Sequence, residues 1–277
     1  MSDLFLNLSV LALVGAGAGY ASGLFGIGGG AVMVPSFFFA FGSLGADEAV
    51  RMHMAVATSS AVIILNSYRS VRAHHAAGSV DMELLWPRPV WNSYALWIGA
   101  GSFLAALWLA PRLSSDMLTV IFAVVALGVA LQFILGRPNF VIRDQVPGGA
   151  GPPLVGGGIG ALSAIMGIGG GSLSVPFLTL FGVPVHRAVG TAAGFGLAIA
   201  LPATLGFMLS GTGEAGRLPG SVGYVNLIGA AAVALCAWPL VKLGARTAHR
   251  LSPGPLRRIF GVLLGLIALN MARVALG

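Results

Sequence analysis

The residues best suited to chemistry are two copies of one glycine-rich sequence, GIGGG, at residues 26–30 and 167–171. Glycine lets the backbone turn its N–H groups inward, so that they form a nest that approaches an anion closely. Each copy precedes a short apolar stretch, and the start of a helix has free N–H groups and a positive dipole end. The pattern predicts an anion-binding site formed by Gly28, Gly29, Gly30, Gly169, Gly170, Gly171 and Ser172.

Two other interpretations of the glycine segments exist. The chain has 42 glycines in 277 residues, and small residues also allow membrane helices to pack closely. The first segment matches the dinucleotide pattern G-x-G-x-x-A, but no strand–helix–strand context surrounds it. The second copy also has Arg187 where that pattern needs an acid. The duplication of the whole sequence favours a ligand site or a gate.

A second repeated motif, His-x-Ala-Val-[Ala/Gly]-Thr, follows each glycine segment, at 53–58 and 186–191. Each threonine lies inside a predicted helix, and further hydroxyls follow the first one. We predict that Thr58, Ser59 and Thr191 donate hydrogen bonds to a polar solute. The alternative, in which the threonine hydroxyls bond to carbonyls four residues earlier in their own helices, is equally compatible with the sequence.

The histidines of this motif, His53 and His186, lie near predicted helix starts on opposite sides of the membrane, beside Arg51 and Arg187. Histidine titrates near neutral pH, so these four residues are candidates for gating or for coupling transport to a proton or other ion gradient. The arginines would also attract anions to the two mouths. The simpler interpretation is an interfacial histidine and arginines that anchor helix ends.

Carboxylates and enzyme motifs are missing from the predicted spans. Buried carboxylates carry cation and proton pathways through membranes, so their absence favours an anionic cargo. The chain has no H-E-x-x-H helix, no serine elbow, no nucleotide P-loop and no cysteine pair, because Cys236 is its single cysteine. The sequence therefore predicts no enzyme activity, no metal site and no cofactor. The acidic residues fall in predicted loops: Asp47, Glu48, Asp81, Glu83, Asp116, Asp144 and Glu214.

The composition identifies the elements that position these residues as membrane helices. The chain is 57% hydrophobic and 8% charged, with a mean hydropathy of +0.92, whereas a soluble domain has about 25% charged residues. The predicted fold is an all-α polytopic membrane protein of about eight to ten helical elements, including short broken or re-entrant half-helices. The net charge of +7 forms no basic face, so the lipid bilayer and not nucleic acid is the expected partner. The elements are expected at 4–22, 31–42, 52–68, 90–109, 117–136, 153–166, 172–182, 188–209, 222–242 and 256–276.

The two halves of the chain repeat one another. The glycine segments match at an offset of 141 residues and the histidine–threonine motifs at 133, and Arg112-Leu113-Ser114 matches Arg250-Leu251-Ser252. We therefore predict a first transmembrane repeat at 1–136, a linker loop at 137–152 and a second repeat at 153–277. Residues 4–22 are predicted to be a retained helix, because no basic segment precedes them.

The basic residues indicate that the second repeat is inverted. Inversion places eleven of them on one side of the membrane and four on the other, whereas parallel repeats give seven and eight. Cytoplasmic loops carry the excess of basic residues, so inversion is favoured and both termini are predicted on the non-cytoplasmic side of the inner membrane. In the inverted arrangement, the side with four basic residues has Arg51, Arg112, Arg217 and Arg273.

The chain resembles the sulfite exporter TauE/SafE family. The resemblance covers nearly the whole chain and depends on GLFGIGGGAVMVP, AVATSSA, GIGGGSLSVPFLTLFGVPVHRAVGTAA, the Gly223-Tyr224-Val225-Asn226 segment and LGARTAHRLS followed by LRRIFGVLL. It implies an integral membrane protein that carries sulfite, an organosulfonate such as sulfoacetate, or a related sulfur compound. By position, it implies functional roles for Gly28 to Gly30, Gly169 to Gly171, Thr58 and Thr191.

The leading hypothesis is a secondary transporter or exporter for a small sulfur-containing anion. The anion would bind at the membrane midplane between the two glycine breaks, and the halves would rock around it. A passive anion channel is the alternative, and an intramembrane enzyme is a third hypothesis. The sequence leaves open the cargo, the direction of transport, the coupling ion and whether the chain forms a homo-oligomer.

Overall fold

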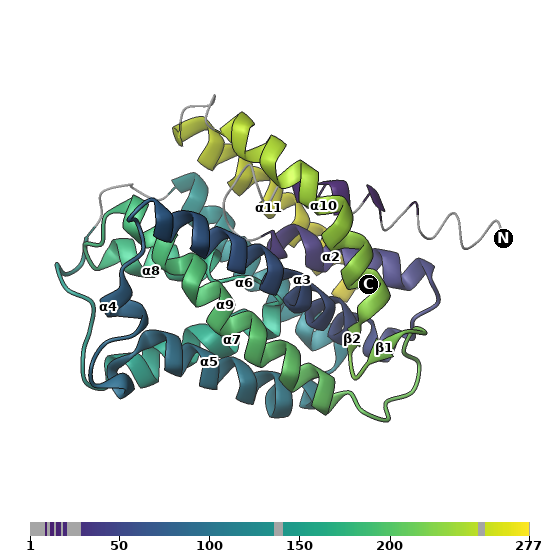
Figure 1. The fold of residues 1–277 in the computed structure, drawn as a ribbon. Helices are drawn as coiled ribbons and strands as arrows, with labels where there is room; N and C mark the ends of the chain where they lie inside the picture. The colour runs from purple at the N-terminus through teal and green to yellow at the C-terminus, as the bar shows by residue number, and fades with distance from the viewer. Residues whose placement is uncertain are drawn as a thin grey trace.

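The computed structural model describes residues 9, 12, 13, 15–17, 19, 20, 29–135, 141–248 and 253–276. Within these ranges the chain is helical apart from loops and one short hairpin (Figure 1). The elements are α2 Gly30–Ser43, α3 Glu48–Ala76, α4 Met82–Leu85, η1 Val90–Asn92, α5 Tyr94–Leu104 with its continuations η2 Ala105–Leu109 and η3 Ala110–Arg112, α6 Ser115–Leu135, η4 Pro152–Gly156, α7 Gly157–Met166, α8 Gly171–Leu180, α9 Val185–Ser210, β1 Ser221–Val222, β2 Val225–Asn226, α10 Leu227–Ala248 and α11 Pro253–Leu276.

The described helices confirm an all-α polytopic membrane fold. Five of them are long and apolar enough to cross a membrane, at 48–76, 94–112, 115–135, 185–210 and 258–276. Their outer faces expose large apolar side chains that only lipid would cover, such as Val124 on α6 and Leu266 on α11. The helices that follow the glycine segments, α2 and α8, have only 14 and 10 residues, as half-helices should.

The predicted element ranges differ from the structure at a few places. Helix α3 continues to Ala76, so His74 and His75 lie in its last turn and not in a loop. The element predicted from residue 222 begins at Leu227, because residues 221–226 form the β1–β2 hairpin and the Asn226 side chain caps α10 by accepting a hydrogen bond from Gly229 N. Most of the predicted 4–22 helix and residues 136–140 of the linker region lie outside the described residues.

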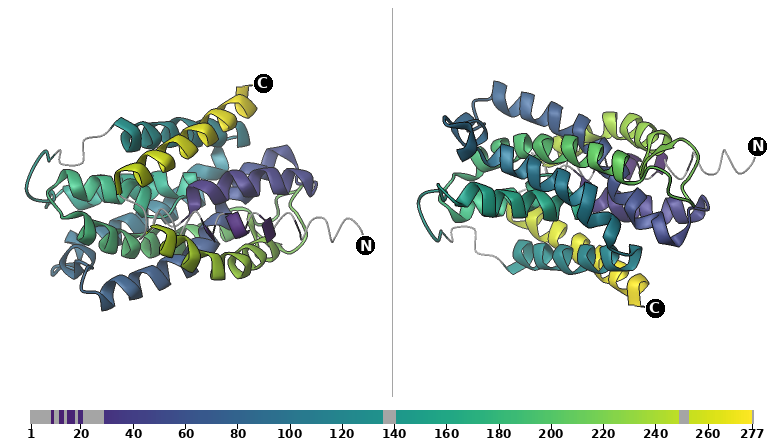
Figure 2. Two further views of the ribbon diagram at one scale, coloured as in Figure 1. Left: turned by 90° about the horizontal axis from the view of Figure 1, so that it is seen from above. Right: turned by 90° about the horizontal axis from the view of Figure 1, so that it is seen from below.

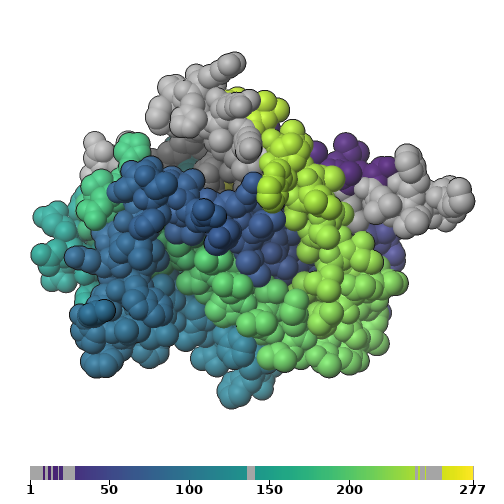
Figure 3. Space-filling model, viewed as in Figure 1, coloured from purple at the N-terminus to yellow at the C-terminus, as the bar shows by residue number. Residues whose placement is uncertain are grey.

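Helices α3 and α9 pack side by side and run antiparallel (Figure 1). In the space-filling view α3 lies across the middle of the face shown (Figure 3). The start of α3 meets the segment after α9, because Asp47 N donates to Gly216 O at 3.0 Å. The segment after α3 meets the start of α9, where a methyl group added at Gly190 would lie 2.3 Å from Ser79 O. These helices contain the two copies of the histidine–threonine motif, so the copies point in opposite directions.

Helices α6 and α11, which close the two halves of the chain, also pair in antiparallel fashion (Figure 2). Gly261 lies against Ile134 and Ala130, whereas Gly265, one turn later, lies beside Ala130 alone. Phe133 and Phe260 meet edge to face, with ring centroids 5.1 Å apart. Both pairs of corresponding helices therefore have the direction that an inverted second copy requires.

The antiparallel helices give the molecule two ends. We call the end with the β1–β2 hairpin the hairpin end, and the end with α4 and residues 141–150 the loop end. Their element positions place Arg51, Arg112, Arg217 and Arg273 at the hairpin end. The other arginines with described side chains belong to the loop end: Arg69, Arg72, Arg88, Arg143, Arg187 and Arg258.

Candidate anion site between the glycine breaks

The second glycine segment breaks the chain between α7 and α8. Gly167 ends α7 in the left-handed conformation, with φ of 61°, where a residue with a side chain would be strained. Residues 167–170 are buried. No described residue accepts a hydrogen bond from the N–H groups of Gly169, Gly170 or Gly171. Buried amides without acceptors are rare in proteins, so this break offers donors to a ligand.

The first glycine segment is described only in part. Gly26 to Gly28 lie outside the described residues, so the structure does not place the predicted site residue Gly28. Gly29 has φ of 74° and precedes α2, and its carbonyl accepts bonds from Val32 and Met33. Gly29 and Gly30 are both buried.

The two breaks contact each other at the centre of the molecule. A methyl group added at Gly30 would lie 2.6 Å from Gly167 O and 2.8 Å from Ile168 Cα. One added at Gly170 would lie 2.5 Å from Ala192 O on α9. The glycines therefore have the close-packing role that was the alternative interpretation. In this conformation that packing encloses the free amides of the second break.

Unpartnered hydroxyls accompany the second break. Ser172 and Ser174 on α8 are 1% and 0% exposed, and neither side-chain oxygen has a hydrogen-bond partner. Ser163 on α7 is likewise buried and unpartnered. The sequence analysis named Ser172 but neither Ser174, two residues further along the same segment, nor Ser163, which precedes the break. A hydroxyl buried without a partner destabilises the protein unless a ligand bonds to it in another state.

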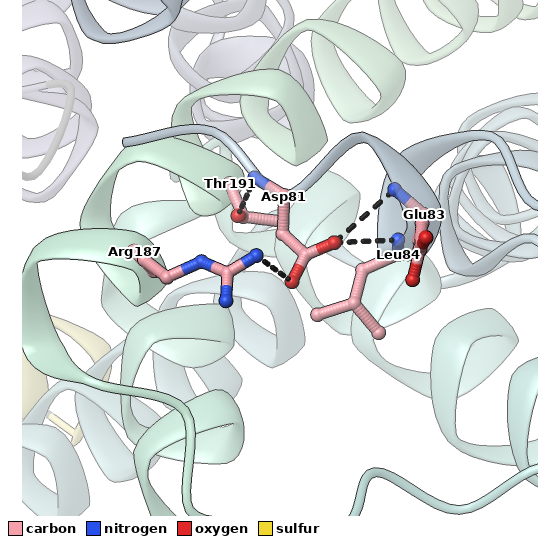
Figure 4. Close-up of polar contacts among 5 residues, drawn as sticks. All are labelled: Asp81, Glu83, Leu84, Arg187 and Thr191. Atoms are coloured by element: carbon pink, nitrogen blue, oxygen red, sulfur yellow. Dashed lines mark hydrogen bonds and ion pairs between the residues drawn. The ribbon is translucent and has the colours of Figure 1, made fainter. Parts of the chain in front are cut away.

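Thr58 on α3 and Thr191 on α9 each contact a segment at one end of the α3–α9 pair. The Thr58 hydroxyl accepts a hydrogen bond from Asn226 N at 3.0 Å. The Thr191 hydroxyl accepts one from Asp81 N at 2.9 Å, as Figure 4 shows. In both bonds the threonine oxygen accepts from a backbone amide of the other half of the chain. A hydroxyl that accepts can still donate, so the donation of Thr58 and Thr191 to a solute stays a prediction.

Asp81 and Asn226 are corresponding residues in the two halves, although neither belongs to the repeats described above. Each follows Gly-x-Val, in Gly78-Ser79-Val80-Asp81 and Gly223-Tyr224-Val225-Asn226. Each caps the helix that follows, since the Asp81 carboxylate accepts bonds from Glu83 N and Leu84 N (Figure 4). The shared pattern was visible in the sequence as a further repeat.

Ser59 lies beside the second break. Its hydroxyl donates to Gly167 O across the interface between the halves. Ser59 is fully buried on α3. The structure therefore places Ser59, Gly167 to Gly171 and Ser172 in one central region. Thr58 instead contacts Asn226 of the β1–β2 hairpin.

The candidate gate residues are not equivalent in the two halves. His53 is buried, and its Nε2 lies 3.1 Å from both Ala110 O and Leu113 O, so it donates to the turn between α5 and α6. The His53 ring also stacks on Tyr224 at a centroid distance of 4.9 Å. His186 is exposed at the start of α9. The surroundings of His53 and His186 therefore do not support the same role for both histidines.

The two candidate arginines also differ. Arg51 approaches its neighbour Glu48 at 3.5 Å and lies over the Phe38 ring. Arg187 forms an ion pair of 2.9 Å with Asp81, linking the start of α9 to the loop before α4 (Figure 4). Both arginines lie at the ends of the molecule, one at each end, as the sequence predicted.

Among the described residues, two cavities lie away from the glycine breaks. One, of about 540 Å³, lies at the loop end and is lined by Asp81, Glu83, Asp144 and Arg187 among others. The other, of about 510 Å³, is an apolar groove between α5 and α7, bordered by Trp97 and Trp108. Neither is lined by residues of the breaks, so neither connects the free amides to water in this conformation.

Comparison with known proteins identifies the relatives of the chain. Residues 11–271 match the family model described as "Sulfite exporter TauE/SafE". A "Probable membrane transporter protein" of Haemophilus influenzae is 31% identical over 97% of this chain and 99% of its own length. Proteins with the same description from Methanocaldococcus jannaschii and Bacillus subtilis are 28% and 26% identical, over 97% and 96% of this chain and 97% of each relative. No solved structure matches the chain.

Proposed function

The chain belongs to the sulfite exporter TauE/SafE family, and we propose that it is a secondary transporter for a small sulfur-containing anion, sulfite or an organosulfonate such as sulfoacetate. The family membership and the relatives described as transporters support a membrane transporter. The observation that carries the anionic cargo is the set of amides at Gly169, Gly170 and Gly171, for which no described residue is an acceptor, followed by the unpartnered hydroxyls of Ser172 and Ser174.

The chemistry of these donors matches an oxyanion. A sulfonate or sulfite group has several oxygens, each of which accepts hydrogen bonds. Backbone N–H groups, serine hydroxyls and the positive end of α8 supply such bonds without a counter-charged side chain. An anion bound here would accept hydrogen bonds from donors that have no partner in this conformation. Its binding free energy would therefore be more favourable than in an apolar cavity.

Alternating access follows from the arrangement of α3 and α9. The repeats are inverted copies that rock around the central breaks, and each end of the α3–α9 pair has a latch. The latch at the loop end comprises Thr191, Asp81 and Arg187, and the one at the hairpin end comprises Thr58 and Asn226. Both latches are closed in this conformation, which would correspond to the occluded state of such a cycle. Opening one latch at a time exposes the site to one side.

The loop end is the cytoplasmic end. It has the larger share of the arginines, which is the bias of cytoplasmic loops in inner membranes. Helix α11 ends at the hairpin end, so this orientation would put the C-terminus outside the cytoplasm; the first eight residues lie outside the described part of the chain. A sulfur anion leaving the cell would thus enter from the loop end.

Reconstituted transport tests the proposal. Proteoliposomes containing the purified protein should show saturable uptake of sulfite or an organosulfonate, and an imposed pH gradient reveals coupling to protons. Gly170→Val should abolish flux, because a methyl group there already lies 2.5 Å from Ala192 O and 2.6 Å from Gly196 N. Gly128→Val, at a position with open space around it, is the matched control. Flux that never saturates would favour the passive channel, and wild-type flux in a folded Gly170→Val protein would exclude the site.

A further inference from the structure

We infer that the anion binds at the second glycine break, that Ala31 and Met33 at the start of α2 serve as an apolar wall, and that the site selects monoanions over dianions. The inference rests on the proposed transport function. It adds two properties, the position of the charged group and its charge. Hydrogensulfite and sulfonates with a single charge would then be cargo, whereas sulfate, fully ionised sulfite and sulfoacetate, which has a second charge on its carboxylate, would be rejected. The inference thus narrows the proposed cargo to monoanions.

The short helices after the two breaks differ in their hydroxyls. At the offset of 141 that aligns the glycines, Ser172 corresponds to Ala31 and Ser174 to Met33. All four residues are 2% exposed or less. Only the second half therefore places buried hydroxyls without partners after its break. Ala31 and Met33 belong instead to the main apolar core, where they offer an anion nothing.

The long helices show the same difference. On α3, Ser59, Ile63 and Ser67 recur every fourth residue and so lie on one face. Ser59 bonds to Gly167 O, and Ile63 lies 3.0 Å from where a methyl group on Gly30 would be. A methyl group added at Gly196 would lie 2.6 Å from Ser67 Oγ and 3.3 Å from Gly170 N. The Ser67 hydroxyl therefore lies near the free amide of Gly170.

The three corresponding positions of α9 have no hydroxyl, although Thr204, one turn further along the same face, is buried and its hydroxyl has no partner. At the offset of 133 that aligns the histidine–threonine motifs, Ser59, Ile63 and Ser67 correspond to Ala192, Gly196 and Ala200. Ser59 and Ser67 on α3 and Ser172 at the start of α8 thus lie near the second break, whereas Ala31 occupies the position of Ser172 on α2. A small organic substituent would pack against Ala31 and Met33 at the start of α2 while its oxyanion group faces the second break.

The charge preference follows from the absence of a cation among these donors. The described arginines belong to the two ends, and Arg69, two residues after Ser67, points to the Trp238 ring on α10. The solvation energy lost on moving an ion from water into a low-dielectric site rises with the square of its charge. Neutral donors offset this loss for one negative charge far better than for two. A dianion would need an arginine that this site does not have.

Binding to the purified full-length protein tests the inference. Titration calorimetry would use methanesulfonate as the monoanion and sulfate as the dianion, at one ionic strength. Methanesulfonate should bind and sulfate should bind at least about tenfold more weakly, the ratio for about 1.4 kcal/mol. Ser172→Ala and Ser174→Ala should each weaken methanesulfonate binding by about tenfold or more, as expected for a lost hydrogen bond to a charged group.

Ser36→Ala is the matched control, because Ser36 lies on α2 and its hydroxyl donates to Val32 O at 2.7 Å within its own helix. Unchanged binding in both α8 serine variants would overturn the position, and equal affinity for sulfate would overturn the charge preference. Either result leaves the transport function standing if flux continues. Failure of every tested sulfur anion to bind or move would overturn the proposed function as well.

Discussion

At the scale of single residues, the buried and half-buried hydroxyls of this protein have three different roles. Thr179 and Ser36 donate to carbonyls of their own helices, as hydroxyls in membrane helices commonly do. Thr58 and Thr191 accept bonds from amides of the opposite half and so hold the halves together. Ser172 and Ser174 have no partner and are available to a ligand. Residue type alone does not separate these roles, because each depends on what the fold brings close.

Replacing Thr191 should therefore destabilise the protein, while replacing Thr179 should not. Thr191→Val removes the acceptor for Asp81 N, and an unsatisfied amide at this partly buried place costs about 1–3 kcal/mol. Thr179→Val removes a hydroxyl that only bonds to the carbonyls of Val175 and Pro176. Thermal unfolding in detergent measures the difference. Equal stability of the two variants would show that the contact between the halves contributes nothing.

At the scale of elements, the sequence predicted the helices well and their contacts poorly. Apolar stretches gave the positions of α2, α6, α8 and α11 to within a few residues, since membrane helices need long apolar runs. The end of α3 was missed because the polar residues Arg72 to His75 look like a loop, although a helix that reaches water tolerates them. The β1–β2 hairpin was missed because two-residue strands have no periodicity to detect.

The candidate site was predictable only as far as the repeats reached. Gly169 to Gly171 and Ser172 belong to a duplicated sequence, so their importance was visible. The contact of Ser67 with this region depends on α3 lying against the second break, about a hundred residues away in the chain. The bond between Thr58 and Asn226 spans 168 residues. A single sequence does not show which of its distant residues come into contact in the fold.

Close packing of α7 on α5 gives a prediction at this scale. A methyl group added at Gly160 would lie 2.0 Å from Ile98 O, whereas one added at Gly158, half a turn away, would meet no atom within 4 Å. Gly160→Ala should force the helices apart and destabilise the protein by about 1–3 kcal/mol or more. Gly158→Ala should be neutral or stabilise by about 0.5–1 kcal/mol, because alanine is less flexible in the unfolded chain. Unfolding temperatures of the two purified variants decide the matter, and a stable Gly160→Ala protein would contradict the close α5–α7 contact.

At the scale of the whole molecule, the direction of α3 against α9 and the distribution of arginines point to the same arrangement. The antiparallel pairs are independent of charge, because they come from contacts such as Asp47 with Gly216 and Gly261 with Ile134. The basic side chains that indicate the membrane orientation lie on helix ends and loops and take no part in those contacts. Packing and charge thus agree on an inverted second half, and the charge rule further assigns the loop end to the cytoplasm.

This assignment predicts which surface a membrane-impermeant reagent reaches. Ala215 at the hairpin end and Gln145 at the loop end are both exposed, and Gln145 borders the 540 Å³ cavity. In a Cys236→Ser background, Ala215→Cys should react with an impermeant maleimide in intact cells, or in spheroplasts if a cell wall blocks access. Gln145→Cys should react only after the membrane is opened, and both should react equally in detergent, which controls for exposure. Labelling of Gln145→Cys alone in intact cells would place the arginine-rich end outside. That outcome would reverse the proposed topology while leaving the antiparallel helix pairs as they are.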